Sequence, residues 1–230
     1  MRGANRSIRR LTFRATLGAI FFLAGVASPA RAQVDFGLYA GPTIATYTGS
    51  YVDSAIRTWG IVGGLWFEWH FSTHWSVEGA ISSSQKGAFE VESPLTAEKH
   101  DYRTSNIEIP IVLNYRTGFA HEKWSFRAFA GGAPAFGASC DVKPSTQFSF
   151  DEECSADTPG GELKSSDFLI QFGIGADRIF KGGSGFGFDA RYSVGTSNLF
   201  SEAEANDLSV KNGVLDLKFR FILPLTGPRP

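Results

Sequence analysis

The chain has 230 residues, with 22 Lys or Arg, 23 Asp or Glu and a formal net charge of −1 at pH 7. It is rich in Gly (26) and Phe (21) and has a single Met (1). Glycines and aromatic residues at regular intervals suit short strands and turns better than helices. The composition therefore argues against a helical bundle and favours an all-β domain.

The first 32 residues have the three parts of a secretory signal peptide. A basic region over 2–14 contains no acid, an apolar run follows over 15–27, and Ala30-Arg31-Ala32 supplies the small-x-small pattern that precedes a cleavage site. The apolar run has 13 residues, whereas a spanning helix needs about 20. We therefore predict that residues 1–32 are a cleaved signal peptide and not a transmembrane anchor.

Proteolytic maturation should leave Gln33 as the new N-terminus, because cleavage follows Ala32. Intact-mass spectrometry of the protein purified from outer membranes measures this directly. Recovery of a chain that still begins at Met1 would contradict the prediction.

The remaining chain has a different charge. The first 32 residues hold six Arg and no acid, so their removal leaves 16 basic against 23 acidic residues and a net charge of −7. Binding to nucleic-acid phosphates requires a basic surface, so we expect no nucleic-acid partner. The remaining 198 residues suffice for one domain and contain no second apolar run of helical spanning length. A membrane would have to be crossed by strands.

Apolar and polar residues alternate with a period of two along the mature chain. In the first segment, for example, Phe36, Leu38 and Ala40 alternate with Asp35 and Tyr39. Such a period is typical of a strand with two different faces, and most of the segments reach the nine to eleven or so residues that a tilted transmembrane strand needs. Eight segments follow this rule, over residues 34–44, 58–71, 75–86, 106–116, 124–136, 167–177, 186–194 and 215–223.

The apolar face distinguishes a membrane barrel from a soluble sandwich or a lipocalin-like cup, which also alternate. This face carries large side chains almost without interruption, such as Trp59, Phe67, Ile109 and Phe172. The interior of an eight-stranded barrel has little room beyond its own side chains. So many large residues therefore fit only on a lipid-facing exterior.

Connection lengths also alternate. Short turns are expected at 72–74, 117–123 and 181–184, whereas longer polar stretches join the other segments, the longest over 138–165. Short periplasmic turns and long extracellular loops are typical of outer-membrane barrels, and an even number of strands leaves both termini in the periplasm. Aromatic residues beside the short turns, including Trp75, are expected to form an interfacial girdle.

The opposite face of the segments carries charges of both signs, which would point into the lumen. Buried charges persist when they are paired, so we interpret them as a packed polar plug; a narrow channel or proton path is the alternative. Closure of the last segment on the first also predicts that Asp35 approaches Arg220, directly or through Lys218. The predicted lumen charges are Glu68, Glu78, Lys86, Glu108, Arg116, Arg127, Asp189, Arg191, Lys218 and Arg220.

The segment 106–115 (Asn106-Ile-Glu-Ile-Pro-Ile-Val-Leu-Asn-Tyr115) resembles the PorT-like family of outer-membrane β-barrel proteins, whose fourth strand reads leucine-glutamate-isoleucine-proline before aliphatics and a tyrosine. Gly41-Pro42, Lys86-Gly87 and 189–195 agree with that family in order and spacing. The resemblance implies an eight-stranded barrel in the outer membrane, and for most members no established activity. We interpret Pro110, within this motif, as a local bend in a continuous strand.

The two cysteines, Cys140 and Cys154, fall in the longest predicted loop. An exported chain passes through an oxidising compartment, where neighbouring thiols normally pair, and neither cysteine has a Cys-x-x-C or His-bearing context. We predict a Cys140–Cys154 disulfide; a redox or metal-binding role of the two cysteines is the alternative hypothesis.

The predicted long loops are acidic. Residues 89–104, 138–165 and 197–211 contain 13 acids against five bases, with 151–153 the densest group. Divalent cations could bridge these acids to lipopolysaccharide. The sequence suggests one candidate catalytic pair, His100 with the nearby Asp101, but this pair falls in a loop that we expect to be flexible. We expect no enzyme activity, metal or cofactor.

These patterns predict an all-β, eight-stranded, antiparallel up-and-down transmembrane β-barrel over 33–224, after the signal peptide at 1–32 and before a short periplasmic tail at 225–230. The expected location is a Gram-negative outer membrane. The expected partners are outer-membrane lipid, lipopolysaccharide and the barrel assembly machinery. The predicted function is a non-enzymatic envelope or surface-contact role; a small-solute channel and a soluble periplasmic binding barrel are the alternatives.

Overall fold

A computed structural model describes residues 33–48, 56–92, 99–117, 124–144, 152–153, 164–198 and 210–225. The chain divides into two compact units, 1–32 and 33–230, and every described residue belongs to the second. The predicted signal peptide and the tail from residue 226 thus lie outside the described residues. Within the described ranges, no helix is long and apolar enough to cross a membrane.

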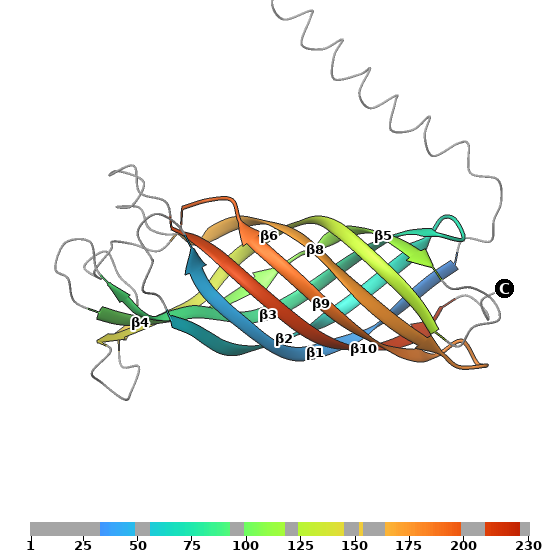
Figure 1. The fold of residues 1–230 in the computed structure, drawn as a ribbon, viewed down its shortest axis with the longest axis horizontal. Helices are drawn as coiled ribbons and strands as arrows, with labels where there is room; N and C mark the ends of the chain where they lie inside the picture. The colour runs from blue at the N-terminus through green and yellow to red at the C-terminus, as the bar shows by residue number, and fades with distance from the viewer. Residues whose placement is uncertain are drawn as a thin grey trace, which may run out of the picture. The chain divides into compact units, whose positions relative to one another are not determined.

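The second unit is a closed antiparallel barrel (Figure 1). Consecutive strands pair along the chain, and β10 returns to pair with β1, which closes the sheet. β4 and β5 together make the fourth barrel strand, and the two-residue β7 pairs only with β6. Eight barrel strands result, as predicted. The elements are β1 (Gln33–Thr48), β2 (Ile56–His70), β3 (Trp75–Glu92), β4 (Lys99–Glu108), β5 (Ile111–Thr117), β6 (Trp124–Pro144), β7 (Glu152–Glu153), β8 (Ser166–Ile179), β9 (Gly185–Gly195) and β10 (Lys211–Pro224).

The break between β4 and β5 is the local irregularity expected at Pro110. Proline lacks the N–H that a ladder position uses, so the regular strand stops at Glu108 and resumes at Ile111. The Pro110 carbonyl still accepts a hydrogen bond from the Ala80 amide at 3.0 Å, and the register with β3 is the same on both sides. The fourth strand is therefore interrupted at Pro110 but keeps one register, as expected for a continuous strand.

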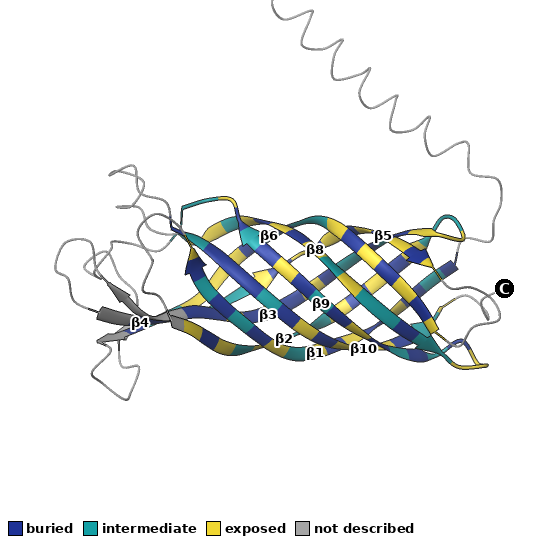
Figure 2. Cartoon of the chain, viewed as in Figure 1, coloured by how far each residue is buried: buried dark blue, intermediate teal, exposed yellow. Residues whose placement is uncertain are grey.

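Burial alternates along every barrel strand, as Figure 2 shows by the chequered colouring of the ribbon. Trp59 and Ile174 point outward and are 67% and 66% exposed, whereas Asp35 and Gln171 point inward and are 0% exposed. In a protein folded in water this distribution would be inverted. The predicted assignment of inward and outward faces is confirmed in all eight strands.

Among the described residues, short turns at 71–74 and 180–184 join strands at one end of the barrel, which we call the short-turn end. At 180–184 the Phe180 amide donates to the Ser184 carbonyl at 2.8 Å, and Gly183 has a φ of 86° that favours glycine. Outward aromatic side chains gather beside these turns: the ring centroids of Trp75 and Tyr115 are 4.9 Å apart, and those of Trp124 and Phe186 are 5.9 Å apart. This is the predicted girdle.

At the other end, which we call the long-loop end, the strands reach farther than the sequence predicted. β3 has 18 residues and β6 has 21, whereas crossing hydrocarbon takes about 9–11. Stretches expected to be loops at 89–104 and 138–165 are therefore partly strand. The pair His100 and Asp101 lies in β4 and not in a loop, and Asp101 is buried. The sequence missed this because polar strands beyond a membrane lack an apolar face.

Candidate functional site: the charged lumen

All ten predicted lumen charges are buried inside the barrel. The centre of their network is Glu78 on β3, whose carboxylate contacts three guanidinium groups. Its oxygens lie 3.2 Å from Arg127, 2.9 Å from Arg191 and 3.1 Å from Arg220. Arg191 is on β9, four barrel strands away from β3. An ion pair between these strands spans the full width of the lumen.

Two further acids balance these arginines. Arg127 forms a short ion pair with Asp189 and lies 3.6 Å from Asp177, and Arg220 also lies 3.6 Å from Asp189. Glycine makes room for this crowding: a Cβ on Gly175 would collide with the Asp189 carboxylate and lie 2.9 Å from Arg127 Nε. A single methyl group at position 175 would thus displace the network.

A second layer lies toward the short-turn end. Arg116 on β5 binds Glu68 at 2.9 Å and Asp177 at 2.6 Å. Glu68 also accepts hydrogen bonds from the Ser76 hydroxyl and the Asn114 amide. A buried carboxylate persists in its charged form when several donors bind it in this way.

The two layers together are electrically balanced. Four arginines face four carboxylates, so the central network carries no net charge. A connected network of this kind can stabilise the structure by more than the sum of its separate pairs. Its members are Arg116, Arg127, Arg191, Arg220, Glu68, Glu78, Asp177 and Asp189.

The three remaining predicted charges lie in separate pairs. Lys86 binds Glu108 at 2.7 Å, and Lys218 binds Asp216 at 3.2 Å. Gln171 links the first pair to the centre, because its amide lies 3.4 Å from Glu108 and its carbonyl accepts from Arg191 at 3.3 Å.

An inward aromatic layer contains Tyr39, which the alternation placed on the inward face, together with Trp66 and Phe129, which it did not identify. Arg220 stacks with its Cζ 3.9 Å from the centroid of Trp66, Arg191 lies 4.8 Å from that of Phe129, and Lys218 Nζ lies 4.6 Å from that of Tyr39. Cations over aromatic faces gain electrostatic stabilisation, more so when desolvated. The parity of Trp66, two residues before the inward Glu68, could have identified it.

The predicted approach of Asp35 to Arg220 is wrong, although closure is right. Both residues face the lumen, but β1 and β10 pair with Arg220 opposite Tyr39 and Pro224 opposite Asp35. A four-residue offset separates them by about 13 Å along the strands. Asp35 instead binds His70 at 2.9 Å.

The predicted disulfide falls partly outside the described residues. Cys140 lies in β6 and is not a free thiol, whereas Cys154 is not described. Asp141 and Glu153 are opposite each other in the pairing of β6 with β7. Extending that register by one pair predicts Cys154 opposite Cys140, so the bridge stays a prediction with a specific geometry.

Replacing Cys140 by Ser should leave barrel folding nearly intact while opening 141–156 to protease. Closing about 15 residues removes roughly 3 kcal/mol of unfolded-chain entropy, and this gain acts on the loop because the ladder already holds the barrel. Limited proteolysis of the folded variant measures the effect. Complete labelling of both cysteines without reductant would rule the bridge out.

Among the described residues, no group of three or more His, Cys, Asp or Glu side chains could hold a metal ion. The described part of the lumen instead holds neutralised ion pairs, and most of the large apolar side chains face outward. A barrel with a polar filled interior and an apolar exterior defines an outer-membrane type of β-barrel.

Comparison with known families agrees with this class. Residues 26–201 match the model of the outer membrane protein beta-barrel domain, and the chain belongs to this family. A search of curated proteins gave no match.

Solved structures similar to this chain include three outer-membrane or surface proteins. The attachment invasion locus protein Ail of Yersinia pestis is 16% identical over 82% of this chain and 98% of its own, with a TM-score of 0.43. OprG of Pseudomonas aeruginosa is 14% identical over 84% and 97%, with a TM-score of 0.49. Neisserial surface protein A is 12% identical over 81% and 96%, with a TM-score of 0.43.

Proposed function

We propose that this protein is a closed, non-enzymatic barrel of the Gram-negative outer membrane that presents its long-loop end for envelope or surface contacts. The observation that carries the proposal is the charged network across the lumen. Glu78 on β3 reaches Arg191 on β9 and Arg220 on β10, and neither of these strands is adjacent to β3. Eight strands leave room for little more than such side chains.

The long-loop end supports a contact role. Outward residues change from apolar to polar there: Ile81 is followed by the exposed Ser83 and Gln85 on β3, and exposed Arg103 lies in the same region of β4. A polar exterior is suited to water beyond the hydrocarbon. The strands therefore extend past the membrane and support the acidic loops.

The partners of this surface follow from its charge. Acidic loops, with 151–153 the densest group, would meet lipopolysaccharide through divalent cations. The short-turn end and both termini would then face the periplasm, where the barrel assembly machinery delivers the chain. The finer resemblance to the PorT-like family remains a prediction, and it adds no task to this proposal.

A soluble binding barrel is the less favoured alternative. Its apolar side chains would have to line the interior, whereas here residues such as Leu65 and Ile111 point outward. A narrow channel is the stronger alternative, and it makes a different experimental prediction.

Conductance in planar lipid bilayers tests the closed lumen. The purified protein should show no discrete openings, because the ion pairs fill the cross-section. The double variant Glu78→Ala with Arg220→Ala removes both members of an ion pair between non-adjacent strands. One anion and one cation are lost together, so neither member of this pair is left behind. Its conductance should exceed that of the wild type. Discrete openings of the unmodified protein would favour the channel.

A further inference from the structure

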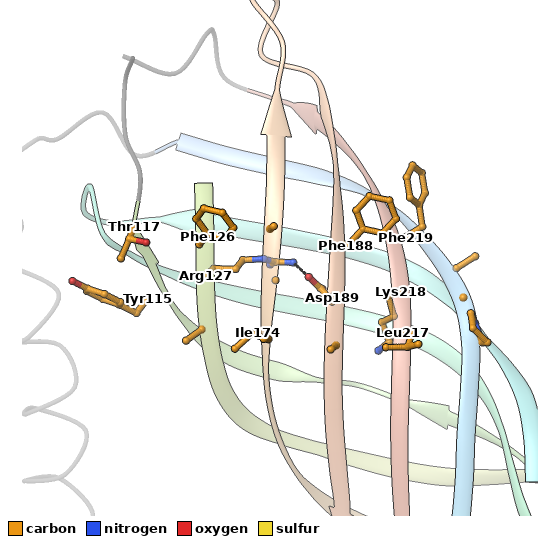
Figure 3. Close-up of a pocket in the computed structure, with 17 residues that line it drawn as sticks. Tyr115, Thr117, Phe126, Arg127, Ile174, Phe188, Asp189, Leu217, Lys218 and Phe219 are labelled. Atoms are coloured by element: carbon orange, nitrogen blue, oxygen red, sulfur yellow. Dashed lines mark hydrogen bonds and ion pairs between the residues drawn. The ribbon is translucent and has the colours of Figure 1, made fainter. Parts of the chain in front are cut away.

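We propose that the outer surface of the barrel carries a binding site for one anionic glycerophospholipid, with an acyl chain in a groove over β6, β8 and β9 and the phosphate at Arg178. The groove is the middle part of a longer hollow of about 830 Å³, whose lining of mainly outward side chains runs from β5 across β6, β8, β9 and β10 to β1 (Figure 3). Sites for small ligands typically have volumes of about 300–1,000 Å³. Because the outward face is the lipid-facing one, an acyl chain is the occupant that suits it.

The groove results from alanines set between large side chains. In one row across the sheet, Ala176 on β8 lies opposite Phe126 on β6 and Phe188 on β9. In the next row, Ile174 lies between Ala128 and Ala190. Small side chains beside aromatic ones leave a hollow with raised walls, whereas a uniformly large surface would be smooth.

Arg178 places a cation at the short-turn end of this hollow. It is the next outward residue after Ala176, half-buried, and lies opposite Trp124 and Phe186. Its guanidinium carbon is 5.5 Å from the centroid of the Trp124 ring, and it forms no ion pair with any described residue. A cation fixed at the membrane interface without a counter-charge among the described residues is suited to a lipid phosphate.

The spacing of the two features matches one lipid molecule. Two residues of strand separate Ala176 from Arg178, or about 7 Å. This distance lets a headgroup phosphate at Arg178 continue through the glycerol into an acyl chain in the hollow. The exposed Lys181, in the turn after β8, adds positive charge on the same side.

A second copy of the chain fits this surface less well. A symmetric dimer contact would use the same patch of both subunits. Two copies of Arg178 would then lie at the same contact, where their like charges repel. The uncompensated cation therefore favours an anionic lipid over a second barrel.

Native mass spectrometry of the full mature protein in mild detergent tests the site, with phosphatidylglycerol and phosphatidylethanolamine of identical palmitoyl and oleoyl chains as probes. The wild type should retain one phosphatidylglycerol molecule in preference to the zwitterionic lipid. Arg178→Gln should weaken this binding at least about tenfold, since it removes a charge-assisted contact. Ala176→Phe should abolish it by filling the hollow.

Ala130→Phe is the matched control, because Ala130 is an outward alanine of β6 outside the groove. It should bind phosphatidylglycerol as the wild type does, and heat-modifiable gel migration identifies folded samples. Equal binding by wild type and Arg178→Gln, or dimer masses without lipid preference, would overturn the proposal. The membrane leaflet that would supply the lipid follows from the orientation proposed above. Binding by the purified protein does not depend on that orientation.

Discussion

Replacing Glu78 by Ala should destabilise the barrel by about 3–5 kcal/mol, because it leaves buried cations without their counter-charge. The Glu78 carboxylate contacts Arg127, Arg191 and Arg220. Water cannot compensate for the lost charge at a position that is buried in the barrel interior. Urea unfolding in lipid vesicles, followed by tryptophan fluorescence, measures the change in the free energy of unfolding.

Asp167→Asn provides the comparison. Asp167 is half-buried and accepts hydrogen bonds from the Phe168 and Ser197 amides, and an asparagine oxygen can keep them. We expect a loss of less than about 1 kcal/mol. Equal losses from Glu78→Ala and Asp167→Asn would mean that the network does not stabilise the lumen.

Replacing Phe172 by Arg should cost about 2–4 kcal/mol in a lipid bilayer, the price of a cation on the lipid-facing side near the midplane. Phe172 points outward from the middle of β8 and is 49% exposed. Ile109→Arg, on the fourth strand, should behave in the same way. Folding into lipid vesicles at increasing urea concentrations measures both losses of stability.

Ser83→Arg is the matched control for these charge insertions. Ser83 also points outward, but it lies on β3 where the exterior becomes polar. An arginine beyond the hydrocarbon should change the stability by about 0–1 kcal/mol. If Phe172→Arg folded as well as Ser83→Arg, the assignment of a lipid-facing exterior would be wrong.

The sequence predicted the barrel well because its main signal is local. The alternation of Phe36, Leu38 and Ala40 with their inward neighbours needs no knowledge of the other strands. The same is true of the ten lumen charges, whose parity along each strand places them inside. The tight turn at 180–184 is likewise signalled by its own glycines.

The partners of each charge could not be predicted, because they depend on the stagger of distant strands. Asp35 and Arg220 share the lumen and lie on paired strands, yet the register separates them. Glu78 instead finds Arg191 across the barrel. Long-range register is set by all eight pairings together, and one residue of slip moves every contact.

The length of the strands beyond the membrane also could not be predicted from local sequence patterns. A strand that leaves the hydrocarbon has no apolar face, so β4 around Asp101 looks like a loop. Trp66 and Phe129 were missed because they appear in apolar stretches, where an inward aromatic residue is not distinguished by its own chemistry. Their burial and their cation partners show that they face the lumen.

Surface labelling of tagged protein tests the orientation of the barrel in an outer membrane most directly. One variant carries a short epitope tag between Glu204 and Ala205, in the acidic stretch at the long-loop end, and the other carries it between Gly182 and Gly183 in the tight turn. An antibody should label intact cells that carry the first tag, and should label the second only after the outer membrane is permeabilised. Labelling of the second tag but not the first on intact cells would contradict the orientation. Labelling of neither tag on intact cells would contradict the outer-membrane location.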